Sequence, residues 1–212
     1  MDYKELDARV RQVGVLPILV TPSVDWVLAA IAALAAGGAR GIEILVRNAE
    51  ALPALVAAKA QFPQLLLAAG TILTRQHYDG AVAAGADFCI APGFAPDVVD
   101  HALSGPIRLV PGVQTASEVM AARARGVTVM KFYPSEPAGG TSVLDDYANV
   151  FPDVSFMPSG KIGAVHVAPY LALPNIASVG GTWMYMQDGQ MLEPAEMQDR
   201  MARAMELVAR RG

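Results

Sequence analysis

The chain repeats one pattern eight times: a short apolar stretch, a turn, and an alanine-rich segment with helical spacing. Apolar stretches separated by helices predict parallel strands that the helices cover. Eight strand–helix units within 212 residues predict an α/β protein with the (β/α)8 TIM barrel fold and an additional N-terminal helix. A doubly wound open sheet is the alternative, although it usually carries fewer strands over this length.

The expected strands and helices alternate along the whole chain, and glycine or proline ends most of the helices. Strands are expected over residues 15–20, 41–46, 65–69, 88–91, 107–110, 127–132, 154–157 and 176–179. Helices are expected over residues 2–13, 25–36, 49–61, 75–84, 96–103, 116–125, 141–150, 165–171 and 194–210. No linker interrupts the pattern, so residues 1–212 are expected to form a single barrel domain.

Composition and charge exclude several classes of protein. The chain is 53% hydrophobic and only 17% charged, as in globular proteins, and its net charge of -4 does not favour nucleic acid as a partner. The one cysteine, Cys89, excludes an intrachain disulfide, and its apolar neighbours favour a place in the core. The N-terminus has no signal-peptide core, and no apolar run reaches the roughly 20 residues of a membrane span. We therefore expect a soluble cytoplasmic protein without membrane contact.

Lys131 lies near the end of an expected strand whose other residues are apolar or aromatic. Lysine is among the residues least often buried, and burial requires a partner, solvent or a neutral amine. A structural ion pair or an extended side chain that reaches the surface would explain it without any function. The functional interpretation is an amine that forms a Schiff base with a carbonyl compound.

Strand alternation places Glu43 and Arg47 on the face opposite Ile42, Ile44 and Val46, so the two charged residues point into the barrel. Lys131 is expected to meet them at the carboxyl ends of the strands, where barrel active sites lie. A buried ion pair is often neutral or destabilising, so stability is a weak reason for these charges. The three residues predict a class I aldolase with Lys131 as nucleophile, Glu43 as acid and base, and Arg47 as a clamp for a substrate carboxylate.

The seventh and eighth expected strands end in segments rich in glycine and hydroxyl residues, over residues 158–163 and 180–183. Barrels often bind phosphate at these ends through backbone N–H groups. Ser159, Lys161 and Thr182 would add side-chain donors. The three histidines fall in expected helices without ligand spacing, so no metal is expected. The methionine-rich C-terminal segment favours core packing or a subunit contact.

Several motifs in the right order resemble one known family, the 2-keto-3-deoxy-6-phosphogluconate (KDPG) and 4-hydroxy-2-oxoglutarate (KHG) aldolases. The resemblance covers nearly the whole chain. Its motifs are residues 14–19, the Glu-x-x-x-Arg strand at 41–47, the Gly-Thr strand end at 69–73, residues 86–93, the Pro-Gly-x-x-Thr segment at 110–115, and Lys-Phe-Tyr-Pro at 131–134, which is similar to the family's Lys-Phe-Phe-Pro.

The resemblance implies a metal-free homotrimer that cleaves KDPG to pyruvate and glyceraldehyde 3-phosphate through a Schiff base on its own lysine, with no other cofactor. In this chain it implies Lys131 as nucleophile and Glu43 as acid and base. The implied substrate contacts are Arg47 and Thr71 at the pyruvate carboxylate, Pro92 and Phe132 nearby, and Ser159, Gly160, Gly181 and Thr182 at the phosphate.

The chain departs from the family pattern at the expected phosphate site. The family's Pro-Thr-Gly-Gly is here Pro-Ser-Gly-Lys at residues 158–161, so Lys161 replaces a glycine. Its charge would strengthen phosphate binding, or its side chain would block the phosphate and favour another acceptor. The alternatives are an aldolase for a related 2-keto-3-deoxy sugar acid such as the galactonate epimer, a phosphosugar epimerase or isomerase, and a binding module without catalysis.

Overall fold

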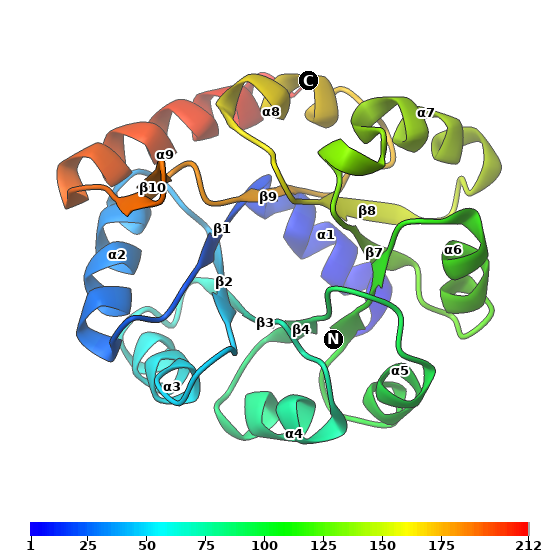
Figure 1. Ribbon diagram of the computed structural model, residues 1–212, viewed down its shortest axis with the longest axis horizontal. Helices are drawn as coiled ribbons and strands as arrows, with labels where there is room; N and C mark the ends of the chain where they lie inside the picture. The colour runs from blue at the N-terminus through cyan, green and yellow to red at the C-terminus, as the bar shows by residue number, and fades with distance from the viewer. Residues whose placement is uncertain (212) are drawn as a thin grey trace.

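A ring of parallel strands is surrounded by helices in the computed structural model, which describes residues 1–211 (Figure 1). The ring contains β1 (Val15–Leu19), β2 (Gly41–Leu45), β3 (Leu66–Gly70), β4 (Phe88–Ile90), β5 (Leu109–Val110), β6 (Gly112–Val113), β7 (Val129–Phe132), β8 (Ser155–Pro158) and β9 (Val179–Gly181). The helices are α1 (Tyr3–Val13), α2 (Val24–Ala36), α3 (Ala51–Gln61), α4 (Arg75–Ala83), α5 (Pro96–Leu103), α6 (Ala116–Arg123), α7 (Gly140–Val150), α8 (Ala164–Leu171) and α9 (Pro194–Ala209). The predicted (β/α)8 barrel is confirmed, and the element ends lie within a few residues of those expected.

The ring is hydrogen-bonded in two arcs. One arc has the strand order β5-β4-β3-β2-β1-β9, and the other has the order β6-β7-β8. The fifth expected strand, over residues 107–110, is observed as β5, and the further short strand β6, which was not expected, follows after Pro111, a residue without an N–H to donate. β5 pairs with β4, and β6 pairs with β7. On the other side, a bridge between Phe156 and Ile176 joins β8 to the chain entering β9. The two junctions close the barrel.

Helix α1 covers the amino-terminal end of the barrel, and in Figure 1 it crosses behind the ring of strands. The side chain of Asp2 caps its start, and Leu6, Val10 and Val13 point inward. These three residues join the apolar filling of the barrel, which includes Phe88 and further strand residues. This end of the interior is therefore dry, and a polar site is left to the opposite, carboxyl-terminal end.

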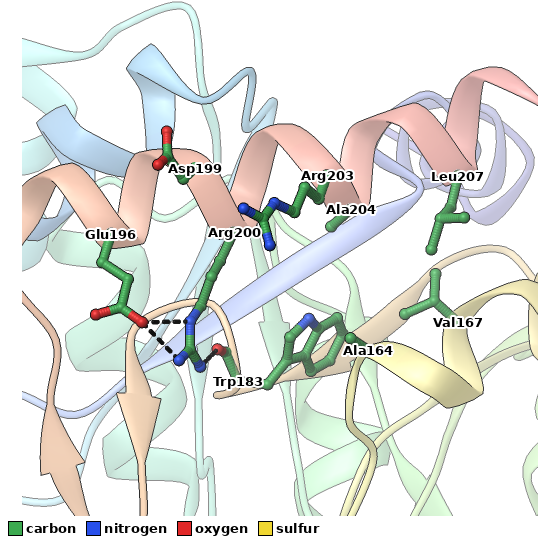
Figure 2. Close-up of a pocket in the computed structure, with 9 residues that line it drawn as sticks. All are labelled: Ala164, Val167, Trp183, Glu196, Asp199, Arg200, Arg203, Ala204 and Leu207. Atoms are coloured by element: carbon green, nitrogen blue, oxygen red, sulfur yellow. Dashed lines mark hydrogen bonds and ion pairs between the residues drawn. The ribbon is translucent and has the colours of Figure 1, made fainter.

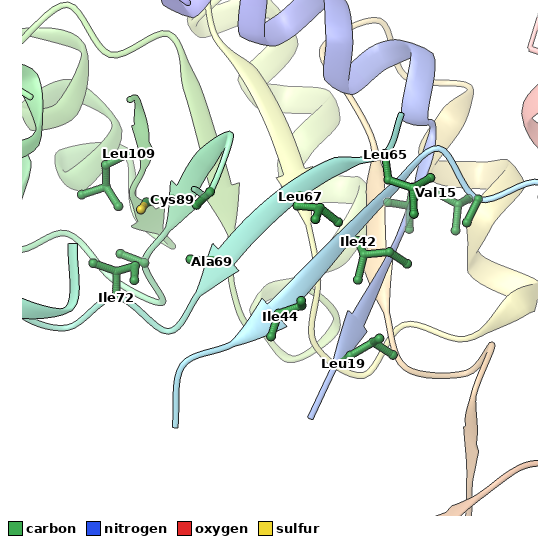
Figure 3. Close-up of a cluster of buried hydrophobic side chains, with 14 of the residues drawn as sticks. Val15, Leu19, Ile42, Ile44, Leu65, Leu67, Ala69, Ile72, Cys89 and Leu109 are labelled. Carbon is green, nitrogen blue, oxygen red and sulfur yellow. The ribbon is translucent and has the colours of Figure 1, made fainter. Parts of the chain in front are cut away.

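The main core lies between the strands and the surrounding helices. Figure 3 shows residues of alternate strand positions, among them Ile42 and Ile44, directed to this side. Fully burying one such aliphatic side chain contributes about 1.5–3 kcal/mol. Cys89 lies in this core as predicted, and burial raises the pKa of its thiol to about 12. Because the apolar positions face outward, the intervening position on β2, Glu43, faces the interior.

Besides β6, two short elements were not expected from the sequence. One is a turn of 3-10 helix, η1 (Glu136–Ala138), after β7. The other is the hairpin of β10 (Met186–Gln187) and β11 (Gln190–Met191), whose turn has positive φ at Asp188 and Gly189. An Asp-Gly pair is a known signal for such a turn. The methionines of the C-terminal segment are largely core residues, with Met197 and Met201 buried on α9. Among the described residues, no helix is both long and apolar enough to cross a membrane.

Candidate active site

Lys131 and Glu43 form a buried ion pair inside the barrel. The Nζ atom of Lys131 lies 3.2 Å from Oε1 and 3.5 Å from Oε2 of Glu43. The side chains of Lys131 and Glu43 are only 9% and 1% exposed. Lys131 is on β7, beside Gly112 of β6, and Glu43 is on β2, so barrel closure brings the two residues together.

A buried charged pair is a weak source of stability, because desolvation of both groups offsets their attraction. The pair is of more use for chemistry than for stability. Only the neutral form of an amine attacks a carbonyl, and a carboxylate at hydrogen-bond distance is placed to accept the proton that the amine must lose. The ring of Tyr133, on the same strand face, lies 5.5 Å from Nζ and covers the amine with an aromatic wall.

Gly70 makes room for the Glu43 carboxylate. It ends β3 and is paired with Leu45, which lies two residues after Glu43 on the neighbouring strand. A Cβ atom at this position would lie 2.2 Å from Oε1 of Glu43, far inside van der Waals contact. The Gly-Thr strand end of the sequence therefore has a steric reason: only glycine fits beside the inward carboxylate.

Gly70→Ala is expected to lower kcat by about 100-fold, because a catalytic group displaced by about 1 Å can lose that much activity. The added methyl also overpacks the interior, so the free energy of unfolding should fall by about 1–3 kcal/mol. Steady-state kinetics and thermal melting measure both effects. Gly93→Ala is the matched control, because a Cβ there would meet nothing within 4 Å. Full activity of Gly70→Ala would show that the carboxylate position is unimportant.

A cavity of about 300 Å³ opens above the ion pair at the carboxyl-terminal ends of the strands. This volume suits a small metabolite. Lys131 lies in its wall with the other sequence-predicted residues Arg47, Thr71, Pro92, Ser159, Gly160, Lys161, Gly181 and Thr182. Residues that the sequence did not single out complete the wall, namely Ile18, Val20, Leu45, Tyr133, Ile162, Tyr185 and Met186. Burial raises the pKa of Tyr185, so its phenol stays protonated.

Phe132 is the predicted substrate contact that the structure places elsewhere. It is fully buried between β7 and the helices, with its ring centroid 6.3 Å from that of Tyr147 and 6.4 Å from that of Phe156. Alternation along β7 sends Lys131 and Tyr133 inward and therefore Phe132 outward. The prediction that Phe132 lies at the substrate is wrong, and Tyr133 lies in the cavity wall instead.

Arg47 and Thr71 make one polar corner of the cavity. The Nε of Arg47 donates to Oγ1 of Thr71 at 3.0 Å, which orients the guanidinium and leaves its two terminal nitrogens for a ligand. Thr71 has a φ of 62°, an uncommon conformation for a residue with a β-branched side chain. Such strained positions gather at ligand sites. This corner is suited to a carboxylate, which pairs with guanidinium in a bidentate manner.

The opposite corner is formed by the β8–α8 loop (residues 159–163) and the end of β9. The hydroxyl oxygen of Ser159 is buried and has no hydrogen-bond partner among the described residues. Gly160 and Lys161 both have positive φ, of 99° and 62°. Lys161 is exposed and takes part in none of the ion pairs of residues 1–211. An unpartnered hydroxyl, a free ammonium and loop N–H groups favour an anionic ligand group at this corner.

A second cavity of about 450 Å³ lies outside the barrel between α8 and α9 (Figure 2). Its wall includes the indole of Trp183, apolar residues of both helices, and Arg200, which donates to Glu196 and to the carbonyl of Trp183. No buried lysine–carboxylate pair lies among the residues that line this second cavity. Within residues 1–211, no group of three or more histidine, cysteine, aspartate or glutamate side chains is arranged to hold a metal ion. The buried Lys131–Glu43 pair lies at the barrel cavity, which makes that cavity the candidate active site.

Comparisons with known proteins identify one family of similar chains. Residues 6–201 match the family model of the KDPG and KHG aldolases. The chain is 37% identical over 179 residues to the 2-dehydro-3-deoxy-phosphogluconate aldolase of Pseudomonas aeruginosa, covering 84% of this chain and 81% of that one. It is 34% identical over 174 residues to the KHG/KDPG aldolase of Escherichia coli, covering 82% of each chain.

Two solved structures are similar over almost their whole length. The KDPG aldolase of Zymomonas mobilis, crystallised with 3-phosphoglycerate, superposes with a TM-score of 0.90 at 32% identity and 96% coverage of both chains. The KDPG aldolase of Legionella pneumophila, which holds pyruvate as a covalent carbinolamine, superposes with a TM-score of 0.83 at 34% identity and 95% coverage of both chains.

Proposed function

Because this chain belongs to the KDPG and KHG aldolase family, we propose that it cleaves KDPG to pyruvate and glyceraldehyde 3-phosphate. 4-Hydroxy-2-oxoglutarate, cleaved to pyruvate and glyoxylate, is the second substrate of the proposal. The enzyme is a lyase of the aldolase class. The observation that carries the proposal is the buried pair of Lys131 and Glu43 beneath a small cavity with two anion-binding corners.

The proposed reaction begins when the neutral amine of Lys131 adds to the keto carbon, C2, of the substrate. Glu43 has first taken a proton from the Lys131 ammonium, and it gives this proton to the keto oxygen as the amine adds. It then removes one of the two protons on the bonded nitrogen and gives it to the hydroxyl of the carbinolamine, which leaves as water to form an iminium ion. Pyruvate held as a carbinolamine is described for the Legionella relative. The same intermediate on Lys131 is part of our proposal, and it requires no cofactor besides the lysine itself.

Carbon–carbon cleavage follows from the iminium. Glu43 removes the proton of the C4 hydroxyl, the bond between C3 and C4 breaks, and its electron pair moves into the iminium to give an enamine. The aldehyde leaves with its new carbonyl. The enamine takes a proton at C3, and water then hydrolyses the resulting iminium to release pyruvate and restore Lys131. Glu43 is within reach of Nζ throughout and serves alternately as base and acid.

The two corners of the cavity give the substrate its direction. Arg47 and Thr71 are proposed to hold the carboxylate next to the reacting carbon. The phosphate at the other end of KDPG is proposed to lie against Ser159, Gly160, Gly181 and Thr182, with Lys161 beside it. The buried hydroxyl of Ser159 supports this placement, because a ligand oxygen would give it the partner that it lacks.

Reductive trapping tests the proposed function. The protein is incubated with pyruvate and borohydride, and the modified peptide is mapped by mass spectrometry. The expected result is one adduct, on Lys131, together with release of pyruvate from KDPG in a coupled assay. An adduct on Lys161, or none, would overturn the proposal. The homotrimer and the cytoplasmic location expected from the sequence remain predictions.

Lys161→Gly is expected to raise the KM for KDPG by about two- to fivefold, because an exposed ammonium contributes up to about 1 kcal/mol to binding a phosphate. The KM for unphosphorylated 4-hydroxy-2-oxoglutarate should not change. Glycine also relieves the positive φ of residue 161, so the melting temperature should not fall. Steady-state kinetics on both substrates makes the test. An equal effect on both, or a lower KM for KDPG, would refute a phosphate-binding role for Lys161.

A further inference from the structure

The loop after β7 and the β8–α8 loop continue the pairing of the two strands beyond their ends. β7 and β8 are paired as far as Phe132 and Pro158. Past that point, Ser135 N–H donates to the carbonyl of Ser159 at 2.8 Å, and Glu136 N–H donates to the carbonyl of Gly160 at 3.3 Å. The chain that follows the nucleophile therefore holds the first residues of the loop at the anion-binding corner.

A buried chain of hydroxyl groups connects the same segment to α8. Ser135 and Tyr170 are both fully buried, and their hydroxyl oxygens lie 2.7 Å apart. The Tyr170 hydroxyl donates to Oε1 of Glu136, which leaves Ser135 as the donor to Tyr170. Burial, followed by the hydrogen bond with Glu136, raises the pKa of Tyr170, so the phenol keeps the proton that it donates. Gly140 leaves space for the hydrogen bond between Tyr170 and Glu136, since a Cβ at residue 140 would lie 3.1 Å from the Tyr170 hydroxyl and 3.1 Å from Oε1 of Glu136.

The second oxygen of Glu136 faces the start of α8. His166 accepts the N–H of Gly163 at its Nδ1 atom, at 2.9 Å, and this fixes the ring proton on Nε2. Nε2 lies 3.5 Å from Oε2 of Glu136. One carboxylate therefore faces both Tyr170 and His166, and His166 in turn holds the last residue of the β8–α8 loop. The loop is fixed at its beginning by backbone bonds and at its end by this side-chain network.

We propose that Glu136 is a positioning residue that sets the β8–α8 loop at a fixed distance from Lys131. The carboxylate oxygens of Glu136 are directed at Tyr170 and His166, away from the residues that line the cavity. It acts through Tyr170 and His166, which place the loop bearing Ser159 and Lys161. The inference rests on the proposed function, because the loop is where the acceptor end of the substrate, its aldehyde and phosphate, is proposed to bind.

Glu136→Ala is expected to raise the KM for KDPG by about tenfold, since loss of hydrogen bonds to a charged group loosens the loop. The lysine and its carboxylate are not part of the network. Exchange of the methyl protons of pyruvate with deuterated water, followed by NMR, should therefore keep its wild-type rate. The KM of Glu136→Gln for KDPG should lie between that of the wild type and that of Glu136→Ala. The carbonyl oxygen of the glutamine accepts from Tyr170, whereas its NH₂ group faces the Nε2–H of His166, another donor.

Hydrogen–deuterium exchange of the free protein provides a readout that does not depend on activity. Peptides covering residues 159–166 should exchange faster in Glu136→Ala than in the wild type. Asn175→Ala is the matched control. It removes a buried hydrogen bond, from Nδ2 to the carbonyl of Leu144 at 2.7 Å, just before β9 at the other end of the barrel. It should lower the melting temperature without a selective change in KM.

Three outcomes would overturn the inference: unchanged exchange of residues 159–166 in Glu136→Ala, an unchanged KM for KDPG, or an equal loss of pyruvate exchange and of KDPG cleavage. The last would indicate a purely structural role, like that of Asn175. Failure of the wild-type protein to exchange the protons of pyruvate would instead contradict the proposed function. In that case the amide exchange of Glu136→Ala still decides whether Glu136 positions the loop.

Discussion

Replacement of Lys131 by methionine is expected to abolish both the borohydride-trapped pyruvate adduct and the cleavage of KDPG. Loss of a covalent nucleophile typically lowers kcat by about 10⁴-fold or more. Methionine keeps the length and apolar character of the lysine stem, so the barrel interior remains filled. It leaves the Glu43 carboxylate, which is 1% exposed, without its cation. Breaking a buried pair in this way costs about 3–5 kcal/mol of stability.

Lys131→Arg separates the chemical effect from the stability effect. Arginine keeps a positive charge beside Glu43 but cannot lose its proton to form an imine. It should therefore melt at a higher temperature than Lys131→Met and be equally inactive. Mass spectrometry after borohydride reduction and a coupled pyruvate assay measure the two effects. Activity that survives either substitution would favour the epimerase or isomerase alternative, which needs no imine.

Glu43→Gln is expected to lower kcat by about 10²–10⁴-fold, the usual contribution of a positioned acid or base. Glutamine has nearly the same shape and fits the space left by Gly70, but it cannot carry protons. Pyruvate should still be trapped by borohydride on long incubation, but more slowly than in the wild type, because Glu43 also carries the protons of imine formation. Time courses of trapping, compared with kcat, reveal this separation.

Glu118→Gln provides the matched control for Glu43→Gln. Glu118 forms a capping box with Thr115 at the start of α6, and glutamine is also accepted at this position of the box. The Glu118→Gln substitution removes one negative charge, as Glu43→Gln does, but it should leave kcat unchanged. If Glu43→Gln retained wild-type turnover, another group would have to carry the protons, and the role given to Glu43 would be wrong.

The barrel and the inward direction of Glu43 and Lys131 were predictable because each depends on local patterns. Eight alternations of apolar strand and alanine-rich helix define the fold, and period-two alternation directs Glu43 and Lys131 inward. The same rule directs Phe132 outward to Tyr147 and Phe156. The assignment of Phe132 to the substrate came from the family resemblance and did not apply this rule, so it was wrong.

The break between β5 and β6 also had a local signal. Pro111 cannot donate a ladder hydrogen bond, and it separates β5 from β6. The Glu136 network had no such signal. It joins residues 34 and 35 positions apart, through the return of α8 against the loop after β7. No spacing in the sequence reveals such a contact, because helix packing creates it.

Strand alternation already indicates which side chains face the barrel interior, because it is a property of the backbone. The residue types at those positions give the chemistry available there: an amine, a carboxylate and a guanidinium. The distances between these groups depend instead on how the whole chain folds. Closure of the ring brings Lys131 within 3.2 Å of a carboxylate 88 positions away, and the pairing of two loops fixes the corner that faces them. Such distances depend on how many strands close the ring and how they are staggered, which is a property of all the strands together.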